Sequence, residues 1–62
     1  MEDNKEKILL FEAHKFVDFE MYVDAINVFK SFTEEYKESK YIDDVYYDIA
    51  ICYFKIKDFN KT

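Results

Sequence analysis

The 62-residue chain contains no glycine and no proline. Folds made of strands and tight turns use both residues as punctuation, so their absence favours an all-α fold. A phosphate-binding loop also requires glycine, which excludes that class of nucleotide site. Cysteine occurs once, at Cys52, so no disulfide can form within the chain.

Basic residues are few, and all of them are lysine. The formal net charge is −5, and no basic patch of the kind that binds nucleic acid is present. No apolar run approaches the length of about 18 residues that suggests a membrane span. The acidic N-terminus does not resemble a signal peptide. We therefore expect a cytoplasmic protein, or a periplasmic one if the chain comes from a secreted scaffold.

Hydrophobic residues are plentiful, at 50% of the chain, and 21% of the residues are aromatic. This composition argues against disorder. It also suggests more apolar surface than one domain of this size can bury. The chain should form a single domain, 1–62, that still presents apolar groups to a partner.

Apolar residues recur at steps of three and four in three segments, which predicts helices at about 4–19, 22–36 and 41–56. The clearest stripe is Ala25, Ile26, Phe29, Phe32 and Tyr36. Short links make consecutive helices antiparallel neighbours, so an antiparallel hairpin plus a third helix is expected. A turn near Lys57 would then let a fourth helix start at 59–62.

The chain also matches itself at an offset of 37 residues, which is typical of a helical solenoid. Size and polarity class are kept at eight positions. The pairs are Leu9 with Tyr46, Leu10 with Tyr47, Ala13 with Ala50, Phe16 with Tyr53, Val17 with Phe54, Phe19 with Ile56, Tyr22 with Phe59, and Ala25 with Thr62.

The stretch AHKFVDFEMYVDAINVF resembles the helix-turn-helix centre of a tetratricopeptide repeat. Its small and aromatic residues follow that family's pattern at Ala13, Phe16, Tyr22, Ala25 and Phe29. The later stretch YKESKYIDDVYYDIAICYFKIKDFNKT resembles the long-spaced variant found in bacterial outer-membrane assembly lipoproteins and periplasmic scaffolds. Residues 8–62 carry the resemblance, about one and a half repeats, which implies an α-solenoid fragment.

Some residues depart from the family pattern. Lys37 stands where the family usually has proline, and Glu20 and Lys57 stand where it often has glycine in the turn. A positive φ at either turn residue would cost roughly 1 kcal/mol.

The resemblance implies that first helices line a concave groove that binds a protein or peptide. The partner-binding residues it implies are Leu10, His14, Val17, Tyr47, Ile51 and Phe54, flanked by Lys7, Asp18, Asp44, Asp48 and Lys55. The alternative interpretation is that these residues bury against a neighbouring helix. A second group, Tyr46, Ile49, Ala50 and Tyr53, is predicted to form an exposed edge of the third helix that mediates oligomerisation.

Catalysis is not predicted. His14 is the only histidine, and Cys52 lies in an apolar stripe where a buried thiol is expected. Asp43, Asp44 and Asp48 lack the additional oxygen ligands that calcium requires, so we expect a solvated acidic face and neither metal nor cofactor.

Three functions remain open at this point. The first is a non-catalytic scaffold that binds a helix or hydrophobic peptide, as the N-terminal part of a longer repeat protein. The second is a structural subunit that self-associates through the third helix as a homo-oligomer. The third is an acidic mimic that blocks a basic surface, which is disfavoured because the carboxylates are spread over all three helices and the links.

Overall fold

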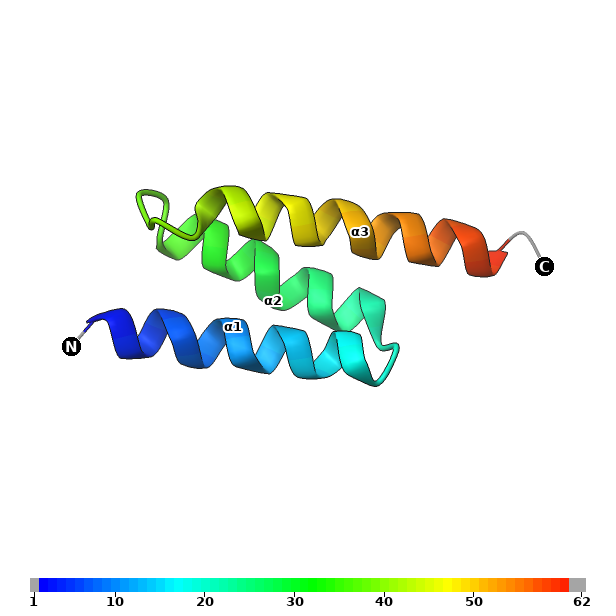
Figure 1. Ribbon diagram of the computed structural model, residues 1–62, viewed down its shortest axis with the longest axis horizontal. Helices are drawn as coiled ribbons and strands as arrows, with labels where there is room; N and C mark the ends of the chain where they lie inside the picture. Colours follow the sequence, from blue (N-terminus) through cyan, green and yellow to red (C-terminus); the bar gives the residue numbers. More distant parts are fainter. Residues whose placement is uncertain (1, 61–62) are drawn as a thin grey trace.

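A computed structural model describes residues 2–60 of the chain. These residues form three α-helices, α1 (Glu2–Asp18), α2 (Tyr22–Glu35) and α3 (Ile42–Asn60), and no strand. Helix α2 packs against both other helices and runs antiparallel to each, so α1 and α3 run in the same direction (Figure 1). The structure confirms the expected all-α fold.

The first two helices begin and end within two residues of the predicted positions, but the predicted end of the third helix is wrong. Helix α3 continues through Lys57 and Asp58 to Asn60, where a turn and a new helix were expected. Neither residue is a glycine or proline that would end a helix. A turn there would also require an unfavourable conformation at Lys57. The remaining part of the predicted fourth helix, 61–62, lies outside the described residues.

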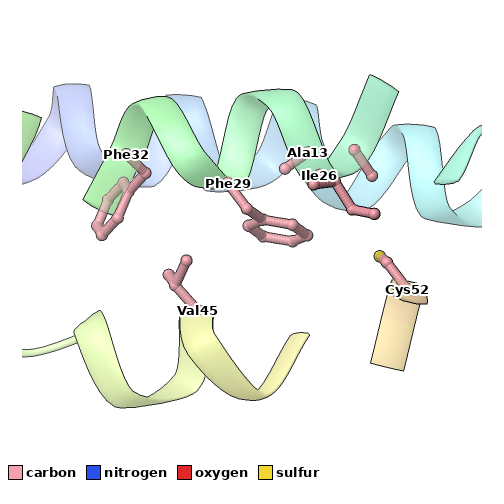
Figure 2. Close-up of a cluster of buried hydrophobic side chains, with 7 residues drawn as sticks. Ala13, Ile26, Phe29, Phe32, Val45 and Cys52 are labelled. Carbon is pink, nitrogen blue, oxygen red and sulfur yellow. The ribbon is translucent and has the colours of Figure 1, made fainter. Parts of the chain in front are cut away.

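The core is built around the apolar stripe of α2. Figure 2 shows Phe29 and Phe32 of α2 pointing toward Val45 of α3, with Cys52 further along the same helix. Every buried side chain among residues 4–58 is apolar. The buried set is Ala13, Ala25, Ile26, Phe29, Phe32, Val45 and Cys52.

Two small residues lie at the packing of α1 against α2. Ala13 and Ala25 are both fully buried, as is Phe29. The His14 ring meets Phe29 edge-on, with ring centroids 5.4 Å apart. Small side chains let the two helices approach closely, and the larger rings fill the space around that contact. Ala13, Ala25 and Phe29 are three of the residues in the small and aromatic pattern noted in the sequence.

Replacing Ala13 with leucine should destabilise the fold by roughly 1–3 kcal/mol, because no space exists for the added methylenes. Ala50 is the matched control, since it is the equivalent residue at the 37-residue offset but is exposed. Ala50→Leu should change the free energy of unfolding by less than about 0.5 kcal/mol. Urea unfolding of dilute samples measures both. Equal effects of the two substitutions would contradict the packing at Ala13.

The link between α1 and α2 places a glutamate in the left-handed region. Glu20 has φ of 61°. Its N–H donates to the Val17 carbonyl at 2.9 Å, and the Met21 N–H donates to the Phe16 carbonyl at 2.8 Å. These two bonds form a Schellman motif, which normally has glycine at the position of Glu20. A β-carbon at this position is strained.

Glu20→Gly should therefore stabilise the fold by about 1 kcal/mol, because it relieves this strain. For a domain of this size, that corresponds to a rise in melting temperature of roughly 4–8 °C. Glu20→Ala is the control, since it removes the same charge but keeps the β-carbon. If alanine stabilises as much as glycine, the gain comes from charge rather than from the backbone.

The link between α2 and α3, residues 36–41, is held by Ser39. Its hydroxyl donates a hydrogen bond to the Glu6 carboxylate on α1. The same hydroxyl oxygen accepts a bond from the Tyr41 N–H at 3.1 Å, just before α3 begins. Ser39 thus satisfies a backbone donor just before α3 and also fastens the link to α1.

Candidate protein-binding surface

One face of α3 carries a row of exposed aromatic side chains. Tyr46, Tyr47, Tyr53 and Phe54 are 58%, 69%, 49% and 69% exposed. At about 100° per residue, all four lie within about 60° of Ala50 around the helix. We call these five residues the outer face of α3. It lies on the side of the helix away from the buried Val45 and Cys52.

The repeat relationship shows why this surface is unusual. The residues of α1 equivalent to Tyr46, Ala50 and Tyr53 are Leu9, Ala13 and Phe16. Ala13 is fully buried, and the other two are half-buried against the core under α2. On α3, by contrast, the three equivalent residues are exposed, although Lys30 lies over the Tyr53 ring. The outer face therefore repeats a helix-packing surface without the helix that packs on it.

The predicted edge residues fall largely on this surface. Tyr46, Ala50 and Tyr53 are exposed, whereas Ile49 is half-buried and packs against the core. Lys30 of α2 lies with its Nζ 5.7 Å from the centroid of the Tyr53 ring. That contact holds the Tyr53 ring at the border between α2 and the outer face.

The residues predicted to line a groove do not share one surface. Leu10 and Val17 are half-buried and pack against the core. His14 faces α3, and its Nε2 lies 3.5 Å from Oδ2 of Asp48, where it forms an ion pair when protonated. Ile51 is half-buried.

Tyr47 and Phe54 lie on the same face of α3 as the predicted edge residues Tyr46, Ala50 and Tyr53. They lie about 100° or more around α3 from Asp48, the residue that meets α1. The structure thus brings His14 and Asp48 together and places the two aromatic residues on the outer face.

Sequence reasoning missed four further exposed apolar residues, which lie on α1, the first link and the start of α2. Ile8, Phe11, Phe19 and Val23 are each more than 60% exposed. The Lys15 ammonium lies 5.8 Å from the centroid of the Phe11 ring. On a helical projection, Ile8 and Phe11 lie on the side of α1 opposite Ala13. That position could have identified them as exposed from the sequence.

Burial shapes the chemistry of Asp48 and Cys52. Desolvation raises the pKa of the Asp48 carboxyl, His14 opposes this shift, and Asp44 adds to it. Burial also raises the pKa of the Cys52 thiol, and Asp48 adds to that shift. A buried thiol with a raised pKa is a poor nucleophile at neutral pH. Cys52 is thus a core residue, as expected.

Asp48→Asn should stabilise the fold at pH 7. The raised pKa means that the folded chain binds a proton at Asp48 more readily than the unfolded chain. The stability that the folded chain gains by binding this proton is complete below the ordinary pKa of 3.8. It is lost as the pH rises through the raised pKa of the folded state. At pH 7 the carboxylate carries a desolvation cost that asparagine lacks. The difference between variant and wild type should disappear near pH 3.

Chemical unfolding at the two pH values measures this effect. Glu12→Gln is the control, because it neutralises an exposed carboxylate on α1. A less stable Asp48→Asn variant at pH 7 would mean that pairing with His14 outweighs the desolvation of Asp48.

Other candidate sites are weak. An open hollow of about 510 Å³ lies beside the link between α2 and α3, lined by Glu6, residues 34–38 and Ser39, and it shares no residue with the predicted groove. Within the part of the chain that the structure describes, no three His, Cys, Asp or Glu residues are grouped to hold a metal ion. None of the described helices is long and apolar enough to cross a membrane.

Comparison of the chain with protein-family models, curated proteins and solved structures gives no match.

Proposed function

We propose that this chain is a non-catalytic protein-interaction module that binds an α-helix on the outer face of α3. The observation that carries this proposal is the cluster of four exposed aromatic rings around Ala50. Contiguous exposed apolar surface is uncommon on soluble proteins and typically marks a contact site. Tyrosine and phenylalanine are enriched at protein interfaces, and tyrosine is among the residues that most often contribute the largest share of the binding energy.

A helix is the partner that fits the spacing of these rings. Tyr46 and Tyr53 are seven residues apart, as are Tyr47 and Phe54. A seven-residue repeat keeps the same side of a helix facing a second helix along its length. Ala50 lies between the two pairs, and its small side chain allows the partner's backbone to approach closely.

The module also has features that support the tetratricopeptide resemblance as part of the proposal. Helices α1 and α3 flank α2 and run in parallel, and small residues lie at the packing of α1 on α2. The partner helix would occupy on α3 the place that α2 occupies on α1. The continuation of α3 through Lys57 departs from the repeat pattern, but it lengthens the helix that carries the binding face.

The described residues give this module no evident nucleophile. The Cys52 thiol is buried, and His14 lies against Phe29 and Asp48 rather than beside a hydroxyl or thiol. These contacts support a role in binding rather than in catalysis.

Helical peptides selected on the wild-type chain from an amphipathic peptide library should require the outer face. We expect Phe54→Ala to weaken their binding by 1–3 kcal/mol, the range roughly typical of aromatic anchors. The free energy of unfolding should change by less than about 0.5 kcal/mol, because the ring is exposed. Calorimetric titration and urea unfolding measure the two effects.

Phe11→Ala is the matched control, since Phe11 is 66% exposed but lies on α1. It should leave peptide binding unchanged. Binding that is weakened by Phe11→Ala, or by neither substitution, would place the site elsewhere. A Phe54→Ala variant that loses helicity together with binding would make Phe54 a structural residue.

A further inference from the structure

We propose that the helix bound by the outer face of α3 is α3 of a second copy, in an antiparallel arrangement centred on Ala50. This inference rests on the proposed function and specifies its partner. It follows from a symmetry in the exposed side chains of α3. In a two-fold symmetric antiparallel pair, a residue n positions before Ala50 lies opposite the residue n positions after it in the other copy.

The aromatic residues are arranged symmetrically about Ala50. Tyr46 and Phe54 are each four positions away, and Tyr47 and Tyr53 are each three positions away. Around the helix, each pair also falls at equal angles on either side of Ala50, about 40° and about 60°. An antiparallel copy would therefore place Tyr46 level with the partner's Phe54 and Tyr47 level with the partner's Tyr53. Because the two-fold axis keeps each residue on its own side of the seam, Tyr47 would lie beside the partner's Phe54 on one side, and Tyr46 beside the partner's Tyr53 on the other. Ala50 would meet its own equivalent at the centre.

Charges at the two ends of the face follow the same symmetry. Asp43 and Lys57 are each seven positions from Ala50, and both side chains are exposed. They lie about 20° on either side of Ala50, in line with the centre of the face. The antiparallel pair sets Asp43 of each copy against Lys57 of the other, which gives two attractive contacts. A parallel pair would oppose like charges at both ends.

The apolar area is sufficient for a weak dimer. Each ring offers about 200 Å², of which 49–69% is exposed, so the four rings present on the order of 500 Å² per copy. Two copies would bury on the order of 1,000 Å², at the lower end of specific interfaces. We expect a dissociation constant in the micromolar range.

Sedimentation equilibrium on the 62-residue chain tests the symmetry through charge reversal. The single variants Asp43→Lys and Lys57→Asp should each raise the dissociation constant by about tenfold at low salt, because each turns two attractive contacts into repulsive ones. High salt should reduce that difference. The double variant Asp43→Lys/Lys57→Asp should return to within about twofold of wild type. A parallel dimer would respond differently, because neither the single nor the double reversal would change its like-charge pairs.

A second pair of variants tests the centre of the face. Ala50→Glu should abolish the dimer while keeping the helical circular dichroism signal, because Ala50 is exposed. Asn27→Glu adds the same charge at an exposed position on α2 and should leave the dimer intact. A dimer weakened instead by Ile8→Ser or Phe11→Ser would show that α1 forms the contact, and the proposed pairing would be wrong.

A chain that stays monomeric up to about 100 µM, well above the expected micromolar dissociation constant, would overturn the self-pairing. The helix-binding function would still stand if selected peptides continued to require Phe54. If the chain neither dimerises nor binds peptides through Phe54, both the pairing and the proposed function fail.

Discussion

The structure depends on the burial of one stripe of α2 between two other helices. Phe29 and Phe32 are fully buried there, and the other core residues pack around them. A domain of this size gains only a few kcal/mol from its core, and the buried side chains of the described residues form one cluster. Because α2 covers α1 and α3 from one side only, each of those helices buries a single stripe. Apolar residues on their other sides remain on the surface.

Much of the fold could be predicted because the sequence offers few alternatives to helix. Without glycine and proline, only the periodicity of apolar residues decides where helices lie, and the stripe of Ala25, Ile26 and Phe29 is unambiguous. Ala13, one of the small residues of the repeat pattern, is buried against α2. The repeat pattern is misleading at Lys57, because its similarity to the first turn predicts a second turn where α3 is continuous. The first turn exists although Glu20 adopts a strained conformation, since α2 then packs on α1. No such packing is present among the described residues after Lys57.

The candidate site was predicted only in part, for a related reason. The 37-residue offset pointed to Tyr46, Ala50 and Tyr53, because their equivalents on α1 lie under α2. The family resemblance assigned Tyr47 and Phe54 to a separate groove, whereas helical geometry places them on the same face as Ala50. The symmetry about Ala50 depends on Lys57 being helical. A turn at Lys57 would have removed one end of that symmetry, so it could not be seen until α3 was known to be continuous.

The charges at the ends of the outer face also restrict what an aromatic surface can do. A row of exposed aromatic rings does not by itself fix the register or direction of pairing, so copies can associate in several ways. Head-to-tail contacts that do not form a closed assembly extend into fibres. An antiparallel pair centred on Ala50 is isologous, so each copy uses its outer face once and assembly stops at two. In a parallel pair, Asp43 would face Asp43 of the other copy and Lys57 would face Lys57, so like charges would meet. In an antiparallel pair with a shifted register, Asp43 and Lys57 of the two copies would no longer lie opposite each other. In the proposed pair, the net charge of −5 on each copy would keep dimers apart, so the same helix could present four aromatic rings to a single partner and still resist further aggregation.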